Sequence, residues 1–250
     1  MIYQGVASGD ISYTNKYGAT TQIGTSAYYS AIYDNTYVGY MNSGSGTSSY
    51  ETAHQNLVDS NAKAEIDSWY KTNIVDKGFS DYVDINTGFC NDRQTMSGGG
   101  VGIGTAGYGS QNSAYAPSIR LQTSGNWRST QTPSLQCANK TRDLFTVSSA
   151  SEGNKKLTYP VGLISSDEVV FAGGFGGYSS TFPYIYTNQI YWTMSPYVYN
   201  SQAFVFMIND EGSLIYGTVS SKYGLRPVIN LRTDTKLTGS GSETDPYIVV

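Results

Sequence analysis

The sequence has 250 residues, enough for one large domain or two small ones, with 15 Lys and Arg against 19 Asp and Glu. A net charge of −4 with so few cations excludes a nucleic-acid partner, because such binders carry a basic surface. Aromatic residues make up 14% of the chain, which excludes a disordered protein. One histidine and two cysteines exclude a His-rich or Cys-rich metal cage, and we expect neither a metal nor a cofactor.

No stretch of the sequence is apolar enough to span a membrane. The longest apolar run, Ala203 to Ile208, falls far short of the roughly 20 residues that a spanning helix needs. Met1 is followed by a strand-like start without the features of a signal peptide. We expect residues 1–250 to form one domain, the C-terminal part of a longer surface protein, with membrane contact only through a missing anchor. The uncharged polar composition favours an extracellular or cell-surface location.

The N-terminal region predicts short strands separated by turns such as Asp34-Asn35. These strands are Ile2–Val6, Thr20–Ile23, Tyr28–Tyr33 and Tyr37–Met41. A loop over 42–49 follows.

The strongest helix prediction covers residues 60–74. Ser60 is a suitable N-cap, and an apolar stripe follows at helical spacing. The spacing of Lys63, Asp67 and Lys71 predicts i,i+4 ion pairs on the outer side of this helix.

The middle of the chain, roughly 94–156, predicts long loops with two short strands, Ser118–Gln122 and Leu144–Val147. A strand over Leu157–Ile164 precedes a short helix that Ser165 or Ser166 caps and that ends at Gly173-Gly174.

The last third predicts a sheet with a hairpin turn over 209–212. Its strands are Ile190–Met194, Ala203–Ile208, Ser213–Thr218, Tyr223–Leu231 and Tyr247–Val250. The sequence therefore predicts an α+β fold, with a mixed but mainly antiparallel sheet, two helices and long loops.

Cys90 and Cys137 have two interpretations. Free cysteines in a reducing compartment would be small buried hydrophobes or reactive thiols. In an exported protein an even pair predicts a disulfide, which we favour. It would stabilise the fold by roughly 4–5 kcal/mol and attach the glycine-rich middle of the chain to the core.

The motifs of catalysis are weak in this sequence. Gly102 to Gly107 spells G-x-G-x-x-G, but neither a strand before it nor a helix after it is predicted, so we expect a loop. His54 is the only candidate for a Ser-His-Asp triad, and no nucleophile motif accompanies it. We therefore expect a surface or capping histidine.

The strongest functional signal is a charge-free, aromatic-rich stretch. Residues 169–209 contain no charged side chain, and thirteen aromatic residues lie between Phe171 and Tyr216. One interpretation is a sheet with an aromatic face in the core. The other adds a recognition surface, because Tyr197, Tyr199 and Asn200 follow Ser195-Pro196 and are predicted on a loop. Both interpretations stay open on this evidence.

Several segments resemble a group of surface proteins from gut Firmicutes. The matching segments are Tyr37–Met41, Trp69–Asn73, Gly88–Arg93, Leu157–Ile164, Tyr191–Pro196, Tyr223–Leu231 and Asp245–Val249. These domains are similar to the C-type-lectin-like fold in its formylglycine-generating-enzyme (sulfatase-modifying) variant. The resemblance covers nearly the whole chain and implies that fold.

The resemblance also bears on function. The related enzyme uses active-site cysteines late in its chain, whereas this sequence has none after Cys137. The same fold carries the variable proteins of diversity-generating retroelements. Their variable residues lie in a last hairpin, a place that Tyr197 to Ser221 occupies here, before Gly224-Leu225-Arg226. The motifs of calcium-dependent sugar binding are missing.

We therefore expect a non-enzymatic, extracellular ligand-binding domain, of the hypervariable type that a retroelement diversifies. Its partner would be an unknown protein or glycan on another cell or on a phage surface. The alternative is a structural subunit of a cell-surface or pilus-like assembly. The expected ligand contacts are among Tyr197, Tyr199, Asn200, Gln202, Phe204, Phe206, Ile215 and Tyr216.

Overall fold

The structure is a computed structural model that describes residues 1–3, 21–97, 103–121, 131–174, 185–240, 245 and 247–250. Its main sheet has the strand order β1-β10-β7-β8-β9, with β5 paired to β7. The bounds of these strands are Thr25–Ala27 (β1), Ser113–Ala114 (β5), Tyr191–Tyr199 (β7), Ala203–Ile208 (β8), Leu214–Thr218 (β9) and Lys222–Gly224 (β10). All pairs in this sheet are antiparallel except β10 with β7. The predicted mixed, mainly antiparallel α+β architecture is confirmed.

Three two-stranded sheets complete the strands. They are Met41–Asn42 (β2) with Val58–Asp59 (β3), Phe89–Cys90 (β4) with Leu144–Phe145 (β6), and Leu237–Thr238 (β11) with Ile248–Val249 (β12). The helices are Tyr50–Ala53 (α1), Asn61–Tyr70 (α2), Ala116–Leu121 (α3), Lys140–Asp143 (α4) and Ser166–Phe171 (α5), with short 3-10 or π turns at Asn35–Val38 (η1), Lys71–Val75 (η2) and Ser80–Tyr82 (η3). The described residues thus contain more helices than the two predicted, most of them a single turn or two.

The helix prediction over 60–74 is confirmed by α2 and η2. Ser60 caps α2 by accepting a hydrogen bond from the Lys63 backbone N–H. The ion pairs differ from the prediction, because Lys63 is fully buried and its Nζ lies 2.7 Å from Asp67 and 3.1 Å from Asp59. Lys71 instead pairs with Asp76. The Lys63–Asp67 pair therefore lies on the buried side of α2, whereas the Lys71 side chain is exposed.

The short helix α5 is also confirmed, with a capping box between Ser165 and Glu168. The strand predicted over 118–122 is wrong, because α3 occupies Ala116–Leu121. Pro117 lies in the first turn of this helix, where proline is favoured because backbone N–H groups have no partner within the helix there. Around 37–41 the chain forms η1, which Asp34 caps, before β2. Residues 157–164 form only isolated bridges.

At the N-terminus, the strand lies at Thr25–Ala27 rather than at 28–33. Most of the predicted strand over 2–6 and Thr20 lie outside the described residues, as does the first residue of the glycine motif. The rest of that motif is a loop without a following helix, as predicted.

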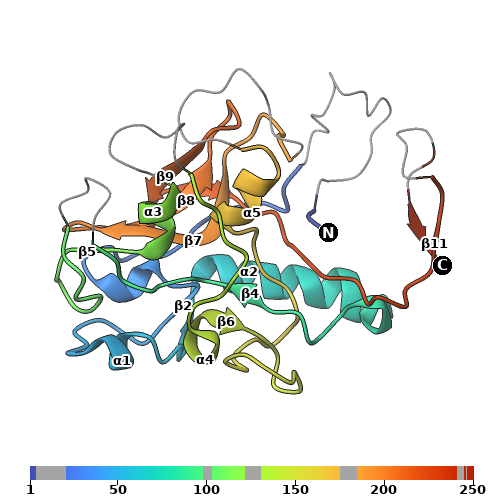
Figure 1. The fold of residues 1–250 in the computed structure, drawn as a ribbon. Coiled ribbons are helices and arrows are strands. Elements are labelled where there is room, and N and C mark those ends of the chain that lie inside the picture. Colours follow the sequence, from blue (N-terminus) through green and yellow to red (C-terminus); the bar gives the residue numbers. More distant parts are fainter. Residues whose placement is uncertain (4–20, 98–102, 122–130, 175–184, 241–244, 246) are drawn as a thin grey trace.

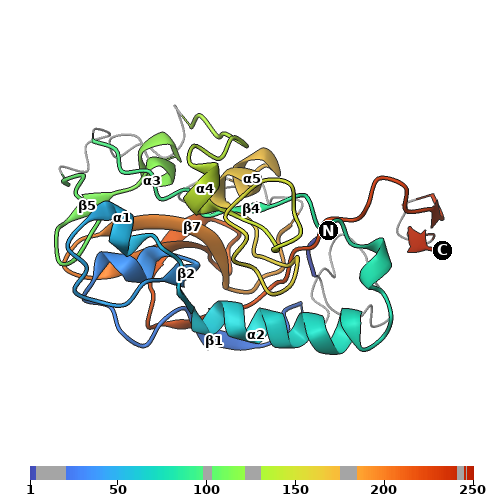
Figure 2. The ribbon, with the colours of Figure 1, turned by 90° about the horizontal axis from the view of Figure 1, so that it is seen from below.

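The core lies between the main sheet and the segments that cover it. Figure 1 shows α3 and α5 against the sheet, and Figure 2 shows α2 running alongside β1. Trp192 of β7 is fully buried, with its indole N–H donating to the Ser26 carbonyl at 2.9 Å. Within the described part of the chain, no helix has the length and apolar character of a membrane span.

Candidate functional site

The eight expected ligand contacts fall on β7, β8, β9 and the turn between β7 and β8. Tyr197 and Tyr199 belong to β7 and are buried, so their predicted loop position is wrong. Pro196 does not end the strand. It pairs with Val205 of β8, and the register between the two strands shifts on either side of this pair. On the other edge of β7, β10 pairs at Tyr191 and β5 pairs at Val198 and Tyr199, so neither strand pairs with Pro196. The missing proline N–H therefore breaks no ladder bond.

Tyr197 and Tyr216 form a stacked pair of rings. Their centroids lie 4.0 Å apart with only 7° between the ring planes. Phe206 meets the edge of Tyr197 at 5.1 Å, and Phe204 meets Tyr216 at 5.7 Å in the same edge-to-face manner. Such contacts stabilise aromatic pairs beyond their burial. We call these four residues the aromatic cluster.

Exposure divides the aromatic cluster into a base and a surface. Tyr197 and Phe206 are buried, Phe204 is half-buried, and Tyr216 is 42% exposed. The β8–β9 register pairs Phe206 with Tyr216, which puts both side chains on one face of the sheet. Tyr216 is therefore an exposed ring held on a buried one, at the edge strand of the main sheet.

The other expected contacts border this face in different ways. Ile215 is half-buried and points to the opposite face, because side chains alternate along a strand. Asn200 is exposed and Gln202 half-buried in the β7–β8 turn, where Ser201 has a φ of 58° and its N–H donates to Asn112. Among the described residues, the side-chain amides of Asn200 and Gln202 have no hydrogen-bond partner.

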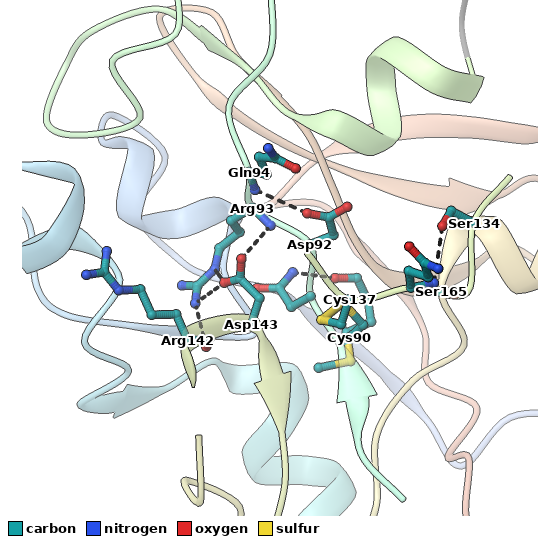
Figure 3. Close-up of a disulfide and its surroundings, with 12 residues drawn as sticks. Cys90, Asp92, Arg93, Gln94, Ser134, Cys137, Arg142, Asp143 and Ser165 are labelled. Carbon is teal, nitrogen blue, oxygen red and sulfur yellow. Dashed lines mark hydrogen bonds and ion pairs between the residues drawn. A yellow bond between two sulfur atoms is a disulfide. The ribbon is translucent and has the colours of Figure 1, made fainter. Parts of the chain in front are cut away.

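The disulfide between Cys90 and Cys137 is confirmed, with the two Cα atoms 5.7 Å apart. It ties β4 to the irregular segment before α4, as the prediction from the sequence required (Figure 3).

Next to the disulfide, Arg93 joins its own segment to two others, around Asn56 and around Asp143. Its guanidinium Nη2 lies 2.8 Å from the Asp143 carboxylate, and both side chains are fully buried. The same group donates to the Asn56 side chain at 2.9 Å and to the Arg142 carbonyl at 3.2 Å. Burial raises the pKa of the Asp143 carboxyl, and the charge of Arg93 opposes that rise. Figure 3 shows this pair beside the disulfide.

A second charged cluster lines a cavity of about 240 Å³, which the disulfide also lines. Arg120 lies between two carboxylates, 2.6 Å from Asp92 and 2.5 Å from Asp167. Asp167 also accepts from the Ser134 N–H, which holds the segment before Cys137 against α5. Because both carboxylates are paired with Arg120, we interpret this cluster as a structural contact that holds the three segments together.

His54 follows α1 at the C-cap position, as a capping histidine would, but it is buried rather than on the surface. Its ring meets the Tyr50 ring edge-on with 4.0 Å between centroids, and within the described part of the chain neither ring nitrogen has a hydrogen-bond partner. Burial lowers the pKa of His54 well below 6.5, and the charges of Arg93 and Arg142 lower it further. Nothing in the described surroundings makes it a general base.

Among the residues that the structure describes, no group of three or more His, Cys, Asp or Glu side chains is placed to hold a metal ion. The sequence analysis did not identify Arg93, Asp143 or Arg120 as important. Their partners lie 28 to 50 residues away in loops without periodicity, so no pattern in a single sequence connects them.

Comparison with known proteins adds no family to this description. No protein-family model, no curated protein and no solved structure matches the chain.

Proposed function

We propose that this chain is a non-enzymatic, extracellular recognition domain that binds its ligand through the exposed side of the aromatic cluster. One observation carries the proposal: the exposed ring of Tyr216 is stacked on the buried ring of Tyr197. A large ring that is already fixed loses little conformational entropy on binding, which is how tyrosine serves in binding surfaces.

The surroundings of Tyr216 fit a ligand that is recognised without ion pairs. Phe204 extends the apolar surface, and the amides of Asn200 and Gln202 supply hydrogen-bond donors and acceptors at the β7–β8 turn. Tyr197 and Phe206 support this surface from beneath, whereas Tyr199 pairs with Ala203 and lies on the opposite face of the sheet. The disulfide fits an oxidising, extracellular location.

A matched pair of tyrosine variants tests the proposal. Tyr33 is 72% exposed and has no ring contact within the described residues, so Tyr33→Ala removes an exposed ring without a supporting partner. The chain would be tested for binding to intact bacterial cells, phage particles and a glycan array. We expect binding that Tyr216→Ala reduces at least tenfold and that Tyr33→Ala leaves unchanged. Equal effects of the two variants, or binding unaffected by Tyr216→Ala, would contradict the proposal.

The resemblance to C-type-lectin-like domains extends the proposal to retroelement diversification of residues 197–221. The structure limits which of these positions can vary, because Phe206, Met207 and Leu214 are buried in the sheet. We therefore expect an adenine-rich template copy, beside a reverse-transcriptase gene, whose variation falls on exposed codons such as those of Asn200 and Tyr216. Flanking DNA without such a copy would overturn this extension and leave the binding proposal intact.

The alternative, a structural subunit of a surface assembly, makes a different prediction about the same face. It requires the aromatic cluster to be buried between subunits. Iodination or nitration of exposed tyrosines, read by mass spectrometry on the native chain, would then spare Tyr216. Modification of Tyr216 in the assembled state supports the recognition domain.

A further inference from the structure

The hairpin of β11 and β12 stands apart from the rest of the molecule. Figures 1 and 2 both show it beyond the far end of α2, away from the main sheet. The two strands pair through only two register positions, Leu237 with Val249 and Thr238 with Ile248. A two-stranded hairpin of this size is marginally stable in water unless another strand or surface adds to it.

The hairpin also exposes several large apolar side chains. Leu237, Tyr247, Ile248 and Val250 are between 46% and 62% exposed. Alternation puts Ile248 and Val250 on one face and Tyr247 and Leu237 on the other, so a fold-back onto one surface of the same chain would cover only half of them.

The outer edge of β12 has backbone N–H and C=O groups that can pair with a further strand. The Val250 N–H donates to the Lys236 carbonyl at 3.1 Å, which makes Lys236 and Val250 a hydrogen-bonded pair. Because such pairs alternate in an antiparallel ladder, the N–H and C=O groups of Tyr247 and Val249 point away from β11. Their spacing of two residues is the repeat of an antiparallel ladder.

The two edges of the hairpin differ in charge. Lys236 directly precedes β11, whereas residues 247–250, which contain β12, carry no charged side chain, and the nearest charge is Asp245, three positions before Ile248. Charged side chains, lysine above all, are the feature with which natural proteins protect an edge strand from pairing. The β11 edge is therefore protected and the β12 edge is open.

We propose that β12 pairs antiparallel with β12 of a second copy of this chain, forming a four-stranded sheet β11-β12-β12-β11 across a two-fold axis. The register follows from the free backbone groups: Tyr247 pairs with Val249 of the second copy, which places the two Ile248 residues opposite each other. The contact is self-complementary and closed, so it stops at a dimer. This inference is independent of the proposed function, because Figure 1 shows β9 in the main sheet, well away from β11.

Cysteine crosslinking tests the register directly. In a non-hydrogen-bonded antiparallel pair, opposite Cα atoms lie about 4.5 Å apart, within disulfide reach, so Ile248→Cys forms a covalent dimer under mild oxidation. Thr238→Cys is the matched control. It lies opposite Ile248 on β11, but two copies of Thr238 would be separated by three strand spacings, about 14 Å, which no disulfide spans.

The wild-type chain should show twice the monomer mass in light scattering after gel filtration, and Ile248→Arg should be monomeric with an unchanged melting temperature. Ile248→Cys should crosslink in non-reducing gels, and Thr238→Cys should not. A monomeric wild-type chain, or crosslinking of both cysteine variants to the same extent, overturns the proposal. Binding to phosphatidylcholine vesicles is a further test. If the wild-type chain binds them and Ile248→Arg abolishes that binding, the proposal is also overturned, because a lipid surface rather than a second copy would cover β12.

Discussion

Two regions of this molecule are held together by different forces. Around β7, β8 and β9, aromatic and aliphatic side chains pack on a continuous hydrogen-bonded ladder. Around the disulfide, between β4 and α5, regular structure is sparse, and two buried charged clusters with one covalent bond hold the chain. The buried apolar side chains of the loop region, such as Phe145, belong to the same core as those of the sheet, but few ladder hydrogen bonds support them. We therefore expect the disulfide and the charged clusters to contribute a larger share of the stability there.

The largest effect is expected from Arg93→Met in the loop region. The substitution leaves Asp143 as an unpaired buried carboxylate and removes the hydrogen bond to Asn56. Breaking one side of such a pair should lower the free energy of unfolding by about 5 kcal/mol. Urea denaturation measures the loss. The double variant Arg93→Met with Asp143→Leu should recover most of it, and a double variant as unstable as the single one would contradict the charge argument.

Removing the disulfide should have the next largest effect. Cys90→Ser with Cys137→Ser frees a loop with a sequence separation of 47 residues. In the chain-entropy account this costs about 4 kcal/mol. The melting temperature of the variant, compared with that of the wild-type chain under reducing and oxidising conditions, measures it. A wild-type chain that melts at the same temperature in both conditions would show that the loops are fixed by their charged clusters alone.

In the sheet region, Phe206→Ala should cost about 3 kcal/mol. The substitution leaves a cavity under Tyr197 and Tyr216, so it should also loosen the stacked pair. Near-ultraviolet circular dichroism reports the tyrosine environment, and denaturation reports the stability. Phe206→Leu keeps most of the volume and should lose much less. An equal loss in both variants would mean that ring geometry, not volume, stabilises this region.

A smaller effect is expected from pH, through His54 in the loop region. Because burial holds its pKa well below 6.5 in the folded chain, the unfolded chain binds more protons below pH 6.5. The free energy of unfolding therefore falls as the pH drops below 6.5, by up to about 1.4 kcal/mol between pH 7.5 and pH 5.5. Denaturation at these two pH values should show this drop in the wild-type chain and a smaller one in His54→Phe. The same drop in both would remove His54 as its source.

The smallest effect on stability is expected from Tyr216→Ala, at about 1 kcal/mol, because the ring is partly exposed and loses only its contacts with Tyr197 and Phe204. Denaturation midpoints of the two chains measure it. The same change should have the largest effect on ligand binding. A loss of several kcal/mol would show that the stacked pair stabilises the fold rather than serving a partner.

The regular parts of this fold could be predicted from the sequence because local patterns determine them. A continuous apolar run before a turn defined β8 with its correct ends. Ser60 and one of the two serines at 165–166 marked the helix starts, and the even number of cysteines indicated the disulfide. The loop region could not be predicted in the same way. Arg93 and Asp143 lie 50 residues apart, and only the folded chain shows that they meet.

The candidate site was predicted in part. Tyr216 and Phe204 are at the surface of the sheet, but Tyr197 and Tyr199 are buried. The error came from treating Pro196 as the end of a strand, when two register shifts let β7 continue past it. Whether a proline interrupts a strand depends on which neighbours pair at that point, and that is a property of the sheet rather than of the local sequence.

The separation of β9 and β11 along the length of the molecule has a consequence for valency (Figure 1). In a dimer joined at β12, the two β9 strands with their Tyr216 residues would lie on either side of the joint and away from it. Such a dimer would carry two separate binding surfaces, so that it engages two ligand-bearing particles at the same time. Mixing the dimer with its target should therefore aggregate the particles.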